Sequence, residues 1–199
     1  MKKYLLFYVL ILTLIFCACG KKEEPKEPVN RQIEKQLPSF SSSQMELLLK
    51  KHINPVFTED VVTVAQIENI LKAAVNSLDI TNSKNLHFSA VMEEEHMKQI
   101  APESTKGCVV IVVSSPNSNT LDFGIATQNI YLAAKANGLY ANISLTGADI
   151  INSNNIKENF GIPNGYNAIC CVCIGNAKEN SNAIYENEIK LDDYVTYIE

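Results

Sequence analysis

Two wholly apolar runs of strand length constrain the fold of this chain most strongly. They cover residues 108–113 and 168–174, and neither contains a charged side chain. A strand with one face in water alternates apolar and polar residues, whereas an unbroken apolar run indicates a strand that is buried on both faces. We therefore expect these two segments to be central strands of a sheet that is covered on both sides.

Helical patterns lie before and between these strands. Thr63 and Gln66 have the spacing of a capping box, and apolar residues recur at helical intervals behind them, which predicts a helix from about residue 64. Further helices are expected at residues 45–52, 93–100, 122–137 and 149–160, and further strands at residues 87–92 and 141–145. The alternation of helices and strands indicates a layered α+β or α/β domain.

The helix expected at residues 122–137 is apolar along most of its length. The face predicted to pack on the core consists of Ile125, Ala126, Asn129, Leu132, Ala133 and Ala136. Gly138 is expected to end this helix.

The N-terminus has the pattern of an export signal. Lys2 and Lys3 precede an almost unbroken apolar run over residues 4–18. This run is shorter than the roughly 20 residues of a membrane-spanning helix and has the proportions of a secretory signal. We interpret residues 1–18 as a signal peptide, residues 19–44, with their prolines and mixed charges, as a disordered tether, and residues 45–199 as the globular domain.

The end of this run resembles a bacterial lipoprotein signal. The sequence FCACG over residues 16–20 places a small residue before Cys19 and a glycine after it. The resemblance implies that Cys19 is lipidated and becomes the new N-terminus, so that acyl chains attach the protein to a membrane. The alternative is an uncleaved membrane anchor. In both cases we expect the domain to be exported and membrane-anchored, on the periplasmic face or the cell surface.

Charge and motifs exclude several classes of function. The net charge of −5 and the pI near 5.3 do not support nucleic-acid binding. The sequence contains no GxGxxG, P-loop or GxSxG motif. Its three histidines lack the spacing of metal ligands, so no metal site is expected.

The cysteines of the last apolar run admit two interpretations. Alternation along a strand places Cys171 and Cys173 on one face and Cys170 on the other, which disfavours a disulfide between neighbours. We interpret them, and Cys108 in the other run, as small core residues. A redox role for Cys170, Cys171 and Cys173 is the alternative, and it requires accessible thiols.

Several segments together resemble the nitroreductase family of flavin oxidoreductases. The most specific are DFGIATQNIYLAAKANGL at residues 122–139 and FGIPNGY at residues 160–166, followed by the second apolar run. LTG at residues 145–147, TNS at 81–83 and KKHIN at 50–54 stand where that family has its flavin-contacting motifs. The resemblance covers residues 46–199.

The resemblance implies an α+β, three-layer fold with a central mixed sheet flanked by helices. It also implies an FMN-dependent oxidoreductase that passes hydride from NAD(P)H or another donor to a small acceptor, such as a nitro compound or a quinone. Because the flavin of this family lies in a dimer interface, a homodimer is expected. The FMN-binding residues that the resemblance implies are Lys50, His52, Asn54, Asn82, Lys84, Thr146, Gly147 and Lys190.

The physical chemistry of these residues suits parts of FMN. Lys50 and Lys190 would neutralise the phosphate, and Asn82 would offer its amide to the ribityl chain or the polar edge of the ring. The backbone N–H groups of Thr146 and Gly147 would face flavin N5, and Gly147 would let the backbone approach a flat ring without a Cβ atom. Since the flavin supplies the chemistry, no side chain is expected to be catalytic.

Departures from the family pattern support an alternative. His52 replaces the motif serine, Asn54 replaces its second basic residue, and Lys84 lies where a Gln-Pro-Trp run is common. Only residues 116–121 separate the first apolar run from the long helix, so the helical excursion that often covers the active site is missing. The alternative is a flavin-less lipoprotein of the same fold with a binding or structural role.

Overall fold

The two apolar runs form the middle of a four-stranded sheet. The computed structural model describes residue 48 and residues 55–78, 85–116, 120–178 and 194–198. The strands are β1 (His87–Val91), β2 (Val109–Ser115), β3 (Tyr140–Ser144) and β4 (Asn167–Gly175), in the spatial order β1-β2-β4-β3. Every residue of β2 is buried. The prediction of two central strands is confirmed.

All neighbouring strands of this sheet are antiparallel. Val110 of β2 lies opposite Cys173 of β4, and Ala141 of β3 lies opposite Ile174 on the other side. β2 and β3 run in the same direction, but β4 is inserted between them. The mixed sheet that the resemblance implied is therefore not found among the four described strands, because no two parallel strands are neighbours.

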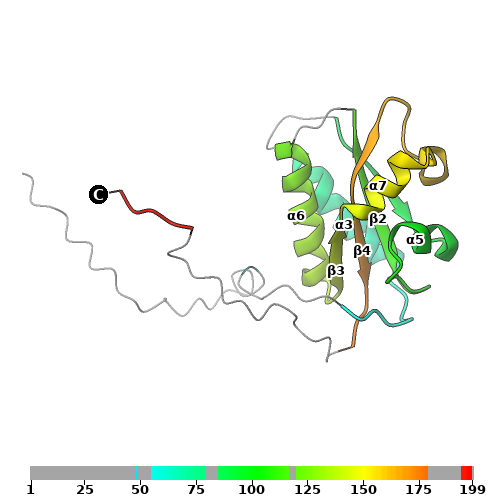
Figure 1. Cartoon of the computed structure of the whole chain (residues 1–199). Helices are drawn as coiled ribbons and strands as arrows, with labels where there is room; N and C mark the ends of the chain where they lie inside the picture. The colour runs from blue at the N-terminus through cyan, green and yellow to red at the C-terminus, as the bar shows by residue number, and fades with distance from the viewer. Residues whose placement is uncertain (1–47, 49–54, 79–84, 117–119, 179–193, 199) are drawn as a thin grey trace, which may run out of the picture. The chain divides into compact units, whose positions relative to one another are not determined.

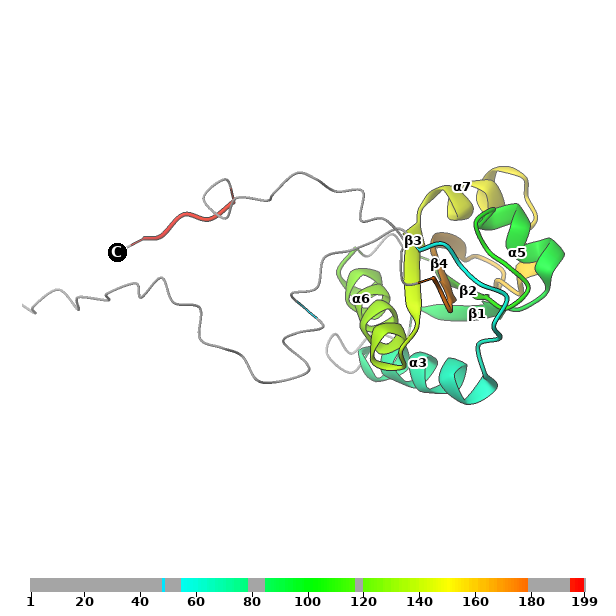
Figure 2. The ribbon, with the colours of Figure 1, turned by 90° about the horizontal axis from the view of Figure 1, so that it is seen from below.

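Helices cover both faces of the sheet. α3 (Val64–Asn76) and α6 (Thr120–Ala136) pack on one face. α5 (Glu94–Ile100), α7 (Thr146–Ser153) and the short 3-10 helix η1 (Lys157–Phe160) pack on the other. Figures 1 and 2 show the sheet between these two helical layers. The predicted α+β, three-layer architecture is confirmed.

Each face of the sheet has its own apolar core. Ile70, Ile130 and Ile174 are fully buried on the side of α3 and α6. Met97 and Ile151 are fully buried on the side of α5 and α7. Strand alternation sends successive side chains of β2 and β4 into different cores, which explains why both strands are apolar throughout.

The capping box predicted at the start of α3 is confirmed. The backbone N–H of Gln66 donates to Thr63 Oγ1 over 3.3 Å, and the backbone N–H of Thr63 donates to Gln66 Oε1 over 3.0 Å. These two bonds satisfy backbone donors that the first helical turn leaves without partners.

The helix predicted at residues 149–160 is wrong in its bounds. α7 begins three residues earlier, at Thr146, and ends at Ser153, and η1 follows as a separate element. The interruption includes Asn155, which has a positive φ of 56°. Asparagine tolerates this left-handed conformation better than most residues, so the local sequence ends the helix there.

The core face predicted for the long helix is only partly right. Ala126 is buried as expected, but the most deeply buried residues after it are Ile130 and Ala134. Leu132 and Ala133 are partly buried against the same core. The helix is apolar on most sides, so its periodicity does not select one face.

Two further predictions have limited support from the described residues. The first predicted helix, at residues 45–52, lies outside them except for Leu48, which is helical and exposed. No helix in the described part of the chain is both long enough and apolar enough to cross a membrane.

Candidate functional site

Only part of the predicted FMN site can be placed. Lys50, His52, Asn54, Asn82, Lys84 and Lys190 lie outside the described residues, as does the predicted lipidation site Cys19. Thr146 and Gly147 are described. They follow β3 directly and form the first two residues of α7.

The start of α7 presents an exposed edge beside a buried backbone. Leu145 precedes the helix with 61% of its surface exposed, and Thr146 is also exposed. The N–H of Gly147, in contrast, donates to Ser144 Oγ over 3.3 Å. The predicted role of this N–H at flavin N5 therefore competes with a hydrogen bond that the chain already makes, and Thr146 is the more accessible of the two residues.

Close packing explains the glycine at position 147. A Cβ atom there would lie 2.4 Å from the carbonyl oxygen of Ile100 and 2.9 Å from Cys171 Sγ. Both distances are shorter than real Cβ contacts, so only glycine lets α7 approach the end of α5 and the middle of β4 this closely. This packing fixes the position of the exposed edge formed by Leu145 and Thr146.

The FGIPNGY segment forms two tight turns. Gly161 has a φ of 62° and ends η1, with its N–H donating to the Glu158 carbonyl over 3.1 Å. Gly165 has a φ of 81°, and the N–H of Tyr166 donates to the Pro163 carbonyl over 3.0 Å. Positive φ favours glycine at both positions, which gives this motif a structural explanation.

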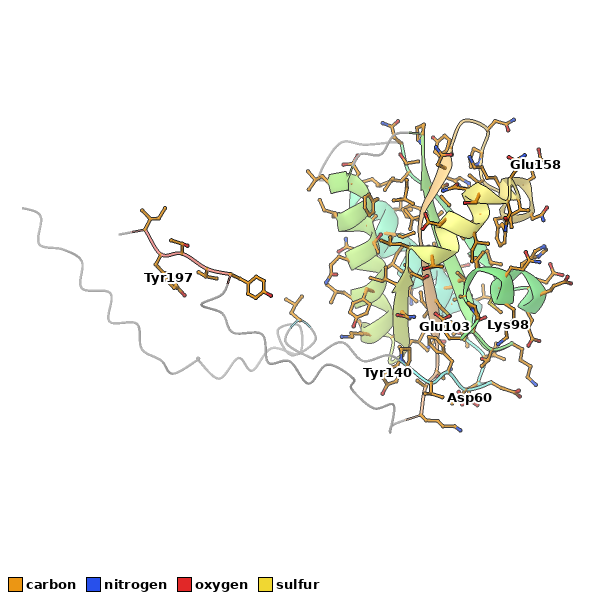
Figure 3. The ribbon with its side chains drawn as sticks, viewed as in Figure 1. Asp60, Lys98, Glu103, Tyr140, Glu158 and Tyr197 are labelled. Carbon is orange, nitrogen blue, oxygen red and sulfur yellow. The ribbon has the colours of Figure 1, made fainter. Side chains whose placement is uncertain are left out.

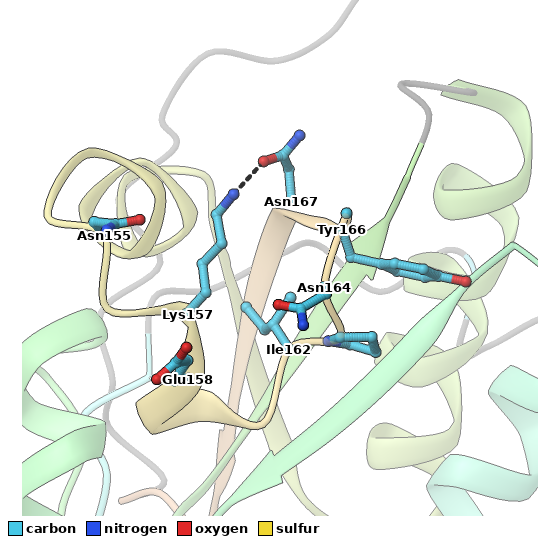
Figure 4. A pocket seen from close by; sticks show the side chains of 9 residues that line it. Asn155, Lys157, Glu158, Ile162, Asn164, Tyr166 and Asn167 are labelled. Atoms are coloured by element: carbon cyan, nitrogen blue, oxygen red, sulfur yellow. Dashed lines mark hydrogen bonds between the residues drawn. The ribbon is translucent and has the colours of Figure 1, made fainter.

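A polar hollow of about 520 Å³ lies beside these turns (Figure 4). Lys157 Nζ donates to Asn167 Oδ1 across it. Its lining residues are Asn155, Lys157, Glu158, Ile162, Pro163, Asn164, Gly165, Tyr166 and Asn167. Neither Thr146 nor Gly147 lines the hollow, so it is separate from the described part of the predicted flavin site.

The polar pair in the middle of α6 has a structural role in part. Asn129 Nδ2 donates to the Ala73 carbonyl over 3.4 Å and so ties α6 to α3. Gln128, its neighbour in the motif, is exposed.

The cysteines of β4 occupy both cores, as alternation predicted. Cys171 and Cys173 face the core under α5 and α7, and Cys170 faces the core under α3 and α6. Burial raises the pKa of Cys171 to about 12 and also raises the pKa of Cys170, against a 3.2 Å contact with Thr127 Oγ1. Both thiols stay protonated near neutral pH and are poor nucleophiles.

Cys108 differs from these core thiols, and sequence reasoning missed the difference. A hydrogen bond from the Cys173 thiol, together with bonds from Thr105, lowers the pKa of Cys108 to about 6 against the effect of burial. Both the backbone N and the Oγ1 atom of Thr105 lie 3.4 Å from Cys108 Sγ. The sequence gives a weak local signal in the Thr105-Lys106-Gly107-Cys108 turn, but it gives none for the contact with β4.

Sequence comparison alone finds no relatives. No family model matches the chain, and none of the curated proteins matches it.

Comparison with solved structures gives a consistent result. The chain is similar to a nitroreductase with bound FMN from Desulfitobacterium hafniense, with a TM-score of 0.66 and 18% identity over 79% of this chain and 99% of that one. It is similar to a nitroreductase with bound FMN from Bacteroides fragilis, with a TM-score of 0.67 and 14% identity over 80% and 100%. Nitroreductase A from Vibrio parahaemolyticus gives 0.57 and 18% over 76% and 80%.

These matches define the class of fold. Each covers at least three quarters of this chain, so the likeness extends over the whole domain and beyond a single motif. The chain has the nitroreductase fold.

Proposed function

We propose that this protein is an FMN-dependent oxidoreductase that passes hydride from NAD(P)H or another donor to a small acceptor, such as a nitro compound or a quinone. The observation that carries the proposal is the fold likeness, which spans 99% of an FMN-bound nitroreductase. The segments quoted from the sequence, residues 122–139 and 160–166, support the same assignment independently.

The described edge of the site fits a planar, electron-rich ring. Leu145 offers exposed apolar surface, and Thr146 stands at the N-terminus of α7, where the helix dipole favours negative charge. When bound, FMN would supply the hydride chemistry. The chain would hold it: Thr146 and Gly147 at the ring, Asn82 and Lys84 at its polar edge, and Lys50, His52, Asn54 and Lys190 at the phosphate.

We propose a homodimer as the functional form. Leu145 lies exposed at the edge of the candidate site, and Ile143 on the edge strand β3 is 40% exposed. A second chain seated here would cover both apolar side chains and enclose the ring. Light scattering is expected to give twice the mass of one chain.

Export and lipid attachment complete the proposal. The supporting observation is the FCACG sequence that ends the apolar N-terminal run. Mass spectrometry of the mature N-terminus is expected to find an acylated Cys19. An intact, unmodified N-terminus would refute this part of the proposal alone.

The test of the enzymatic function compares matched lysine variants of the full chain. Lys50→Ala and Lys190→Ala are expected to weaken FMN binding at least tenfold and to lower NAD(P)H-dependent reduction of a quinone. Lys72→Ala is the control, because Lys72 is exposed and pairs only with Glu68 on its own helix among the printed-sequence neighbours on α3, at 3.7 Å. Equal effects of all three substitutions would contradict the assignment of the phosphate ligands.

The flavin-less alternative has one specific observation in its favour. The N–H of Gly147 is already bonded to Ser144 Oγ, so the chain satisfies this donor without a ligand. Under this alternative the protein keeps the fold for a binding or structural role. Failure of the full chain to bind added FMN would favour it.

A further inference from the structure

We propose that Cys108 and Cys173 are a redox-active pair that forms a reversible disulfide across the sheet when the protein meets a hydroperoxide. This inference does not depend on flavin binding. It assigns a modification site to two thiols that the proposed oxidoreductase chemistry does not use.

The two thiols meet because of strand register. Val110 lies opposite Cys173, and Cys108 stands two residues before Val110, so Cys108 and Cys173 project from the same face of adjacent chain segments. Both belong to the core under α5 and α7. Their side chains are joined by a hydrogen bond, so the two sulfur atoms already face each other.

The surroundings of the pair make its members unequal. Cys108 Sγ receives the N–H of Thr105 over 3.4 Å, and the ammonium group of Lys98 adds a favourable charge. The hydrogen bond to Cys108 and burial raise the pKa of Cys173. Cys108 is thus the thiolate that attacks, and Cys173 is the protonated thiol that resolves.

A glycine makes room for the reactive sulfur. A Cβ atom at Gly175 would lie 2.7 Å from Cys108 Sγ and 2.8 Å from Cδ1 of Phe57. The absence of that atom lets the thiol and the phenyl ring pack over the end of β4. Any larger residue at 175 would displace one of them.

A short segment of chain covers the pair. Phe57 forms a bridge with Ala177, and the N–H of Thr58 donates to the Asn176 carbonyl over 2.8 Å. Thr105 Oγ1 donates to the Thr58 carbonyl. This cover leaves Cys108 only 4% exposed and Cys173 1% exposed, which restricts access to small oxidants.

The cover lies at the end of the domain where several charged residues gather. Figure 3 shows Asp60, Lys98 and Glu103 at this end, near the start of β3 at Tyr140. Asn176 Nδ2 donates to the Asp60 carbonyl over 3.0 Å, and Lys98 Nζ donates to the Ser104 carbonyl. The pair is therefore close to a polar surface although both thiols are buried.

The reaction balances with a hydroperoxide as the oxidant. The Cys108 thiolate attacks a peroxide oxygen, the O–O bond breaks, and hydrogen peroxide is reduced to hydroxide as sulfur becomes sulfenic acid. Cys173 then attacks the Cys108 sulfur. The S–S bond forms, the S–O bond breaks, and the Cys173 proton leaves with the hydroxide as water. An external dithiol reverses the product.

The experiment treats the full chain with hydrogen peroxide, then alkylates it in denaturant and digests it without reduction. Trypsin places Cys108 in a peptide of residues 107–135 that holds no other cysteine, and Cys173 in a peptide of residues 158–178. Wild-type protein is expected to yield the two peptides joined, and dithiothreitol is expected to separate them. The control Cys170→Ser, which changes a thiol on the opposite face of β4, is expected to cross-link equally well.

A second variant keeps the test decisive if Cys108→Ser does not fold. In Cys173→Ala the sulfenic acid at Cys108 has no resolving thiol, so dimedone is expected to label Cys108 in this variant and not in the wild type. The proposal is overturned if Cys108 stays alkylatable after peroxide treatment, if it pairs with Cys170 or Cys171, or if Cys173→Ala shows no dimedone adduct.

Discussion

The contact between α7 and α5 makes Gly147 the most sensitive glycine that we can test. In Gly147→Ala the new methyl group would lie 2.4 Å from the Ile100 carbonyl oxygen and 2.9 Å from Cys171 Sγ. The nearer atom belongs to the backbone, so relief requires α7 or the end of α5 to move.

The expected loss follows from these distances. Overpacking of this kind costs about 1–3 kcal/mol, and a backbone obstacle places the cost toward the upper end. Alanine recovers about 0.5–1 kcal/mol relative to glycine in a helix, which leaves a net loss of about 2 kcal/mol. Gly124→Ala is the matched control, because a Cβ atom there meets nothing within 4 Å on α6. It is expected to stabilise the protein by about 0.5–1 kcal/mol.

Urea unfolding of the full chain, followed by circular dichroism, measures both effects. A loss of about 2 kcal/mol lowers the urea midpoint by about 1 M for a domain of this size, whereas the control raises it slightly. The reasoning about α7 is refuted if Gly147→Ala unfolds at the same urea concentration as Gly124→Ala.

Three further predictions test the core, the cap and the thiolate. Ile130→Ala is expected to lose about 2–5 kcal/mol in the same urea assay, because Ile130 is fully buried between α6 and the sheet; an unchanged midpoint would contradict this packing. Thr63→Ala is expected to lose about 1 kcal/mol through its bond with Gln66, and Gln66→Ala should show little additional loss in the double variant. Because the pKa of Cys108 is lowered to about 6, its thiolate forms as the pH rises through 6; ultraviolet thiolate absorbance at pH 7 should be lower in Cys108→Ser, and equal absorbance would refute it.

Local patterns predicted the order of elements well. The two apolar runs became β2 and β4, and the capping box at Thr63 became the start of α3. These features depend on residues that are close in sequence, so one sequence is enough to read them. The start of α7 was missed because Thr146 and Gly147 are poor helix formers, and packing against Ile100 overrides their local preference.

The candidate site was harder to predict than the fold. The sequence proposed that Gly147 admits a ring, but the structure shows that its hydrogen side packs against the chain itself. The meeting of Cys108 with Cys173 depends on the register between β2 and β4. Such long-range contacts leave no periodic signal in a single sequence, so they required the structure.

The absorption spectrum of the full chain with FMN tests the central claim most directly. The purified protein would be incubated with FMN, passed through a desalting column and compared with Lys72→Ala and Lys50→Ala treated in the same way. The account predicts a flavin spectrum that stays with the wild type and Lys72→Ala, near one FMN per chain, and that is reduced in Lys50→Ala. A colourless wild-type protein after this treatment would contradict the assignment as a flavoprotein and leave only the fold.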